Sequence, residues 1–315
     1  MAFLRLIRFK NLLIIVLLQL LLRYVLLLPM LAHYGLEPAL SHLRFALLVL
    51  TTVFLAASGY VINDYFDIKT DLINRPSRVV AGQVYPRRTV LLWHVLFTFL
   101  GVFMGLFLAY ISRKENYALM FILVPALLWY YSTTLKKQML IGNLVISFMT
   151  AIVPYFVVSL EFAVLARVHG EAILDTEACS MAWFWTTGFA FFAFASNLGR
   201  EIIKDLEDVK GDAEAGCRTL PIEMGEPATR RLAAILHAAL LLALWIVYAM
   251  VPQLRSSPLA FVYFLVLLTL PFLWLIFKVL KARSRIDYHK ASQWSKLIML
   301  LGILFVFVVR SFFPL

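Results

Sequence analysis

The chain has 315 residues, of which 63% are hydrophobic and only 15% are charged, whereas a soluble domain is typically about 45–50% apolar. Because so few polar side chains cannot cover a globule of this size in water, a water-soluble enzyme and a disordered chain are both excluded. The formal net charge is +11. In a membrane protein, topology and anionic lipid headgroups explain such an excess, and no nucleic-acid partner is needed.

Long apolar runs predict nine transmembrane helices, each close to the roughly 20 residues that cross a bilayer. Lipid offers no hydrogen-bond partner to free backbone, so runs of this length must be helical. The predicted helices cover residues 11–31, 43–66, 88–111, 116–135, 140–163, 180–204, 229–251, 258–280 and 292–312. Residues 1–315 are therefore expected to form one all-α, polytopic membrane domain with a weak internal repeat.

Basic residues indicate how these helices are oriented. Lysines and arginines gather before the first predicted helix and in the loops after the second, fourth, sixth and eighth. The positive-inside rule places the N-terminus and these loops in the cytoplasm. Cys179 and Cys217 then fall on opposite faces, so no disulfide is expected. We expect a protein of the inner (plasma) membrane of a prokaryote, with its active site facing the cytoplasm.

Two acidic segments with the same spacing, D-x2-D-x3-D, follow the second and sixth predicted helices. The first contains Asp64, Asp67 and Asp71, and the second contains Asp205, Asp208 and Asp212. Offsets of 0, 3 and 7 residues fall within an arc of about 60° on a helix, so each trio is predicted to line one helical face. In the second segment, Glu201 and Asn197 extend this polar line toward the membrane interior.

Carboxylates spaced this closely repel one another, and they are costly to keep ionised near hydrocarbon. Hard oxygen ligands suit Mg²⁺, which takes one or two carboxylates together with phosphate oxygens and water. Two facing clusters therefore predict two Mg²⁺ ions and a bridging diphosphate, whose departure the ions would assist. In the alternative interpretation the acids are solvated helix ends or partners of nearby lysines, which two equivalent copies disfavour.

At this point the residues resemble the two signatures of UbiA-type intramembrane prenyltransferases. The matching segments are Asn63-Asp64-x-x-Asp67-x-x-x-Asp71 followed by Asn74-Arg75-Pro76, and Asp205-x-x-Asp208-x-x-x-Asp212. The resemblance covers most of the chain. It implies a prenyl diphosphate donor held through Mg²⁺ at both clusters, an allylic carbocation and a lipophilic or amphiphilic acceptor. It also implies a metal-binding role for Asn63 and the six aspartates.

The same resemblance implies further substrate contacts. Arg75 and Arg78 would meet the diphosphate. Tyr131 and Lys136 are similar to a Tyr-x-x-x-Lys element, although the spacing here departs by one residue. Arg8 and Asn11 are similar to an Arg-x-x-Asn element. The remaining predicted substrate-binding residues are Asn63, Asn197, Glu201 and Lys204.

The acceptor is less well defined by the sequence. The run from Arg200 to Asp208, with Thr219-Leu220-Pro221-Ile222, resembles the branch that prenylates geranylgeranylglyceryl phosphate in archaeal-type lipid synthesis. Because this run lies beside the diphosphate site that every branch shares, an aromatic or quinone-precursor acceptor and haem farnesylation remain open.

Two other classes of membrane protein also carry acidic residues in or beside their spans. In a cation-coupled transporter or channel, the acids should lie near the midplane, whereas here they follow helix ends beside arginines. A CDP-alcohol phosphotransferase requires D-x2-D-G-x2-A-R, and Ile68 follows Asp67 here. Arg23 lies near the middle of the first predicted helix. There it could contact a polar acceptor, pair with an acid such as Glu201, snorkel to the interface, or form a purely structural pair.

Overall fold

The structure is a computed structural model that describes residues 1–314. Within that range nine helical segments are long and apolar enough to cross a membrane, which confirms the predicted all-α, polytopic fold. They are Phe9–His33, His42–Phe66, Arg87–Ser112, Glu115–Lys137, Ile141–His169, Glu177–Glu214, Glu226–Met250, Pro258–Lys281 and Arg285–Arg310.

Several of these segments are built from shorter helical pieces. The first consists of α2 (Phe9–Leu20), the π-helical turn η1 (Leu21–Leu27) and α3 (Leu28–His33). The eighth and ninth consist of α13 (Pro258–Val262), η5 (Tyr263–Thr269), α14 (Leu270–Lys281), α15 (Arg285–Leu304) and α16 (Val306–Arg310). The other long helices are α4 (His42–Phe66), α6 (Arg87–Ser112), α7 (Glu115–Thr133), α8 (Ile141–His169), α9 (Glu177–Glu214) and α11 (Glu226–Met250).

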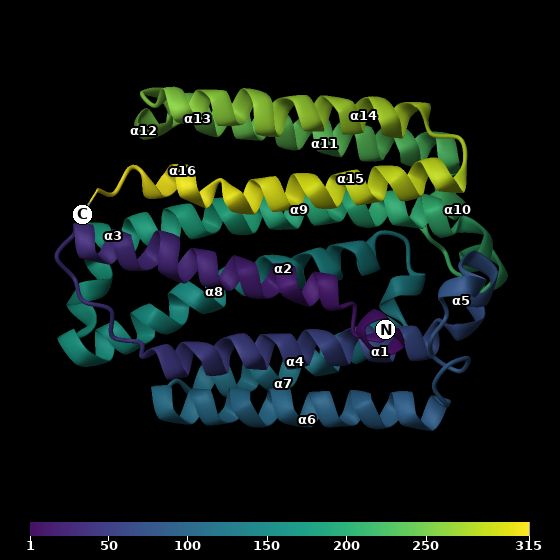
Figure 1. Cartoon of the computed structure of the whole chain (residues 1–315), viewed down its shortest axis with the longest axis horizontal. Helices are drawn as coiled ribbons and strands as arrows, with labels where there is room; N and C mark the ends of the chain where they lie inside the picture. Colours follow the sequence, from purple (N-terminus) through teal and green to yellow (C-terminus); the bar gives the residue numbers. More distant parts are fainter. Residues whose placement is uncertain (315) are drawn as a thin grey trace.

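Short helices connect these spans. They are α1 (Ala2–Leu6), α5 (Ile68–Asn74), η2 (Pro76–Arg78), η3 (Leu135–Lys137), η4 (Glu171–Asp175), α10 (Leu220–Met224) and α12 (Pro252–Arg255). In Figure 1 the long helices lie roughly side by side, and α5 and α10 sit together at one end of the bundle. The central helix is α9, which packs against α8, α11 and α15, while α4 packs against α6 and α7.

Two of the extensions beyond the predicted helix bounds bear on the site. The helix predicted over 180–204 is α9, which runs from Glu177 to Glu214 and is about 57 Å long, against about 30 Å of hydrocarbon. The last span begins at Arg285 and not at 292, because the Ser284 side chain caps its N-terminus in a capping box with Asp287. Hydrophobicity alone missed both extensions because they are polar.

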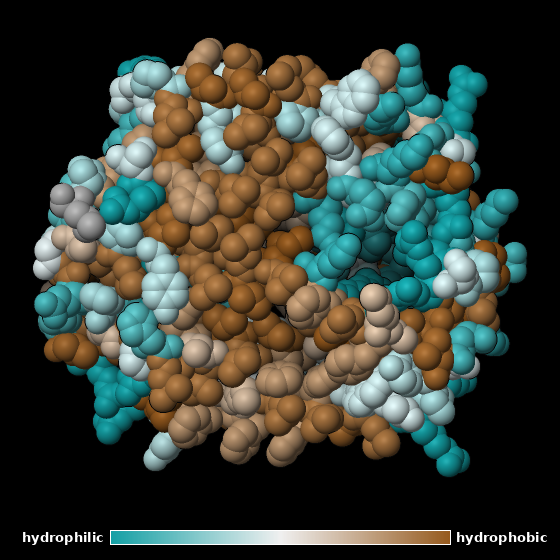
Figure 2. Space-filling model, viewed as in Figure 1, coloured by the Kyte–Doolittle hydropathy of each residue, from teal (hydrophilic) through white to brown (hydrophobic). Residues whose placement is uncertain are grey.

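The surface separates into an apolar belt and a polar opening. Figure 2 shows hydrophobic residues across the middle of the molecule, as expected for a surface that faces lipid. Toward the end where Figure 1 shows α5 and α10, a hollow is ringed by hydrophilic residues. On the face that Figure 2 shows, the fold therefore presents a polar entrance into an apolar bundle.

Candidate active site

A large cavity leads from this polar entrance into the bundle. Its volume is about 810 Å³, which is within the range of small-molecule sites. Its inner wall is apolar and aromatic, and includes Leu18, Phe121, Phe156, Phe189 and Phe192. Phe121 and Phe156 stack on each other with ring centroids 5.4 Å apart. The cavity thus joins a charged mouth to an apolar interior, the shape that an amphiphilic substrate requires.

The first acidic segment lies at a break between two helices. Helix α4 ends at Phe66 and α5 begins at Ile68, so Asp67 sits between them. The predicted single helical face is therefore interrupted. The backbone N–H of Asp67 still donates to the Asn63 carbonyl at 2.9 Å, and that of Asp71 to the Asp67 carbonyl at 2.8 Å. The helical register is kept across the break, and Asn63, Asp67 and Asp71 all line the cavity.

Asp64 has a different environment from the other acids of its segment. It is absent from the cavity lining, and its carboxylate accepts a hydrogen bond from Arg8 at 2.9 Å. The pairing explains how a carboxylate is kept at this depth, because Arg8 supplies the opposite charge. The predicted role of Asp64 in metal binding stays a prediction.

The second acidic segment lies entirely on α9. Asp205, Asp208 and Asp212 line the cavity, as do Asn197, Glu201 and Lys204 further along the same helix. The Asp205 carboxylate accepts a hydrogen bond from Asn143 of α8 at 2.8 Å. The sequence reasoning missed Asn143, although a polar residue in an apolar run was a usable signal. The continuous helix gives this trio the shared face that the spacing predicts.

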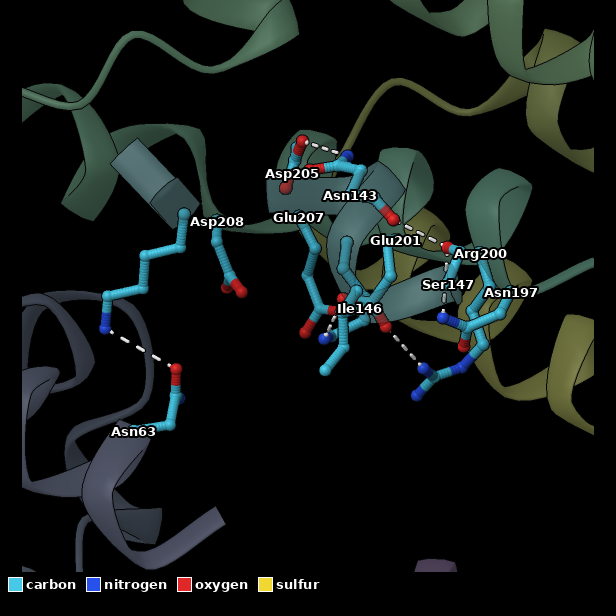
Figure 3. A network of polar contacts seen from close by, with 12 residues as sticks. Asn63, Asn143, Ile146, Ser147, Asn197, Arg200, Glu201, Asp205, Glu207 and Asp208 are labelled. Atoms are coloured by element: carbon cyan, nitrogen blue, oxygen red, sulfur yellow. Dashed lines mark hydrogen bonds and ion pairs between the residues drawn. The ribbon is translucent and has the colours of Figure 1, made fainter. Parts of the chain in front are cut away.

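The two segments meet through the last residue of α5, Asn74, and the residue after it, Arg75. Arg75 donates to both oxygens of Asp208, at 2.6 and 2.9 Å, and lies 3.3 Å from Glu207. The Asn74 side chain donates to the Asp208 carbonyl and accepts from the Gly211 N–H, both at 3.0 Å. A Cβ on Gly211 would lie 2.5 Å from Asn74, so this close approach requires glycine. In Figure 3, Asn63 and Asp208 lie on the same side of the open space.

A lysine from η3 lies against the first acidic segment. Lys136 forms an ion pair with Asp67 and donates to the Asn63 side chain at 3.5 Å. Tyr131, on the same span, also lines the cavity. The sequence spacing placed Tyr131 one residue off the expected element, yet the structure brings both side chains to the cavity.

The acids present the donor set that a divalent cation prefers. Burial, followed by the nearby charges of Asp67 and Asp64, raises the pKa of Asp71 to about 6. Among residues 1–314, no three His, Cys, Asp or Glu side chains are gathered closely enough to hold a metal by themselves. Carboxylates that approach singly or in pairs fit Mg²⁺, which leaves most of its coordination to water and substrate oxygens.

Other predicted residues have mixed positions. Asn197 donates to Ser147 at 3.2 Å and lines the cavity. Asn11 lines it too and accepts a hydrogen bond from Lys296. Arg78, in contrast, is exposed and lies outside the lining. The structure therefore gathers every predicted substrate-binding residue except Arg78 around one cavity.

Arg23 does not reach the cavity or Glu201. It is fully buried and donates to Glu161 at 2.6 Å. Of the roles considered for Arg23 from the sequence, the structure shows the purely structural ion pair.

Comparisons with known proteins agree with this architecture. Residues 21–297 match the model of the UbiA prenyltransferase family. Digeranylgeranylglyceryl phosphate synthase of Methanothermobacter thermautotrophicus is 30% identical over 256 residues, which cover 81% of both chains.

Solved structures show the same fold. A structure of digeranylgeranylglyceryl phosphate synthase matches with a TM-score of 0.62 and 23% identity, covering 98% of this chain and 97% of the other. A UbiA homologue from Archaeoglobus fulgidus bound to DMAPP and Mg²⁺ matches with a TM-score of 0.53 and 18% identity, covering 98% of this chain and all of the other.

The fold and the cavity define an integral, multi-pass membrane enzyme that handles an amphiphilic substrate. The chain belongs to the UbiA prenyltransferase family. The predicted enzyme class is thereby confirmed, and the predicted magnesium cofactor agrees with the ion bound by the Archaeoglobus homologue. The transporter hypothesis receives no support from these matches.

Proposed function

We propose that this protein transfers a prenyl chain from an allylic prenyl diphosphate to the hydroxyl group of geranylgeranylglyceryl phosphate, forming an ether lipid. One observation carries the proposal: two acidic segments from distant parts of the chain line one cavity and are joined by Arg75 and Asn74. The name shared by its curated relatives supports the glyceryl phosphate acceptor. The family resemblance alone would leave aromatic acceptors open.

The acidic mouth and the aromatic interior of the cavity have different chemical roles in this proposal. Oxygen ligands for Mg²⁺ would come from Asp67, Asp71, Asp205, Asp208 and Asp212 and from the Asn63 side chain in the lining, and from Asp64, which follows Asn63 in the sequence. Bound Mg²⁺ supplies positive charge that offsets the charge growing on the diphosphate as it leaves. The aromatic interior holds the prenyl chain and keeps water from the allylic carbon.

The protein's own cations take part in binding the donor. Lys136 and Arg75 lie against the acidic segments at the mouth, where charge-assisted hydrogen bonds to a diphosphate are strong. In the reaction, the bond between C1 and the diphosphate oxygen breaks and its electron pair stays on the diphosphate. The acceptor hydroxyl oxygen bonds to C1, and its proton passes to water at the open mouth.

Positive charge on the connecting loops supports a cytoplasmic position for the mouth and the N-terminus. The whole of residues 1–315 would act as one transmembrane domain in an inner (plasma) membrane, because the cavity draws its lining from α2, α4, α5, α7, α8, α9 and α15.

The test is prenyl transfer by the purified protein in liposomes, with and without a chelator. Asp67→Asn and Asp208→Asn keep side-chain size but remove charge, and each should lower turnover by about 100-fold or more. Asp175→Asn, at an exposed site in η4, is the matched control and should keep full activity. Unchanged turnover in both cavity variants would contradict the proposed metal-binding role.

Product mass identifies the substrates. Allylic diphosphates of several lengths are combined with geranylgeranylglyceryl phosphate and with hydroxybenzoate or quinone-precursor acceptors. An ether product of the glyceryl phosphate supports the proposal. Product from an aromatic acceptor alone would overturn the acceptor but leave the prenyltransferase assignment standing.

A further inference from the structure

One wall of the cavity carries positive charge that the metal and diphosphate chemistry does not use. It is formed by Arg200 and Lys204 on α9, Lys296 on α15 and Asn11 on α2, which we call the basic wall. Lys296 lies 11 positions after the first residue of α15, Arg285, or about 16 Å along the helix. An ionisable residue within a span is a candidate for a functional role, unless the protein itself supplies its counter-charge, as it does for Arg23.

Lys296 differs from the other partly buried cations of the cavity because it lacks an acidic partner. The paired cations are Arg8 with Asp64, Arg75 with Asp208, Lys136 with Asp67, and Arg200 and Lys204 with Glu201. Across the described residues 1–314, Lys296 forms no ion pair, and its ammonium donates to the neutral side chain of Asn11. Its charge is therefore uncompensated within the protein.

The surroundings of Lys296 add to this excess. The charged groups that act most strongly on its ammonium are the cations Arg200, Lys10, Arg8 and Lys204. Within the basic wall, Arg200 and Lys204 share the carboxylate of Glu201, and Lys296 has no ion-pair partner among residues 1–314. The side chains of this wall therefore include more cations than carboxylates, an excess that a bound anion would compensate.

Unused hydrogen-bond donors point to the same ligand. Lys296 lines the cavity, and its ammonium has two hydrogens beyond the one that it donates to Asn11. A phosphate monoester carries about −1.5 to −2 charges and three acceptor oxygens. Its charge and its acceptors match what the basic wall lacks.

Most of the basic wall lies away from the place where the diphosphate is expected, and only Lys204, which directly precedes Asp205 on α9, adjoins it. The acidic segments and their cations, Arg75 and Lys136, come from the chain around α5, the end of α7 and the far end of α9. In Figure 3, Asn63 and Asp208 lie toward one side of the open space, and Arg200 and Asn197 lie toward the other. Two anionic headgroups could occupy the cavity without being forced against each other.

We propose that the basic wall binds the phosphate headgroup of the acceptor, with Lys296 as its main anchor and Arg200 and Lys204 as further contacts. This inference rests on the proposed function, and it names the acceptor class as an amphiphile with a phosphate monoester head. It also gives the enzyme a way to orient the acceptor, since a phosphate held here leaves the glycerol hydroxyl free to approach the donor.

Binding without catalysis is the first test. A monoalkyl glycerophosphate and the matching uncharged monoalkylglycerol are titrated into the detergent-solubilised protein in the presence of chelator and without donor. The wild-type protein should bind the phosphate form about ten- to hundredfold more tightly. Lys296→Met should lose most of this preference, whereas Lys296→Arg should retain it.

Lys290→Met is the matched control, because Lys290 is an exposed lysine on the same helix and lies outside the cavity lining. It should keep the wild-type preference. An unchanged preference in Lys296→Met would overturn the proposal. If that variant fails to fold, the wild-type comparison decides alone, because equal binding of the charged and uncharged amphiphiles also overturns it.

Kinetics separate this site from the donor site. Lys296→Met should raise the KM for the acceptor and leave the KM for the prenyl diphosphate unchanged. A rise in the donor KM alone would mean that Lys296 holds the diphosphate and would overturn the proposal, as would tighter binding of a carboxylated aromatic amphiphile than of the glycerophosphate. Wild-type protein that binds the glycerophosphate at this wall but does not prenylate it supports the site while contradicting the proposed function.

Discussion

Ionised groups lie inside the bundle in two regions: the ion pair between Arg23 and Glu161, and the charged lining of the cavity. The two regions differ in what compensates the charge. Both side chains of the pair are 0% exposed. Arg23 donates to Glu161 at 2.6 Å and to the Leu40 carbonyl. The other oxygen of Glu161 accepts from the N–H groups of Ala39 and Leu40 at 2.7 and 2.9 Å.

Around the cavity, in contrast, charges are only partly compensated. Asp71 and Asp212 form no ion pair within residues 1–314, Lys296 meets a neutral amide, and all three line the cavity. The Arg23–Glu161 pair lies outside that lining. Intramembrane charge thus has a structural role where the protein supplies the counter-charge, and a binding role where a ligand must supply it.

The largest expected effect is a loss of protein stability when Glu161 is substituted. Glu161→Gln leaves the Arg23 guanidinium buried without a counter-charge, so unfolding in detergent should require about 3–5 kcal/mol less free energy. Glu171→Gln, at an exposed position in η4, is the control and should unfold like the wild type. Equal stability of the two variants would show that the buried pair contributes little to folding. Lys296→Met, which removes a charge from the cavity lining, should be far less destabilising than Glu161→Gln.

The same difference explains which parts of the molecule the sequence could predict. The nine spans follow from hydropathy because each must remain helical in lipid. The acidic segments follow from spacing because residues three and four apart share a helical face. Neither argument predicts which side chains far apart in the sequence are in contact. The partner of Arg23 on α8 could therefore not be predicted.

Lys296 shows how one boundary error hides a functional residue. With the last helix predicted to begin at 292, Lys296 falls within its first two turns, and none of the motifs found in the sequence includes it. The polar turns from Arg285 that precede it are helical in the structure, which places Lys296 well inside the bundle beside the cavity. Its depth is thus a tertiary property that hydropathy does not encode.

Arg75 and Arg78 offer a sharper test, because the family resemblance gave them the same role. Arg75 is 25% exposed and contacts Asp208, whereas Arg78 is exposed outside the cavity lining. Arg75→Met should raise the KM for the prenyl diphosphate about tenfold, the expected loss of a charge-assisted hydrogen bond. Arg78→Met should leave it near the wild-type value. Equal effects of the two substitutions would contradict the assignment of the donor site to the Arg75 side.

The smallest effect is expected where charge is fully hydrated. Arg218 donates to Glu223 at 2.5 Å, but its side chain is 77% exposed. Water and salt screen such a pair, and ordering two flexible side chains offsets much of the attraction. Glu223→Gln should therefore leave both thermal unfolding and prenyl transfer unchanged within measurement error, at low and at high salt. A clear loss of stability that disappears in high salt would mean that this surface pair contributes to the fold, and that exposure alone does not separate the protein's weak ion pairs from its strong ones.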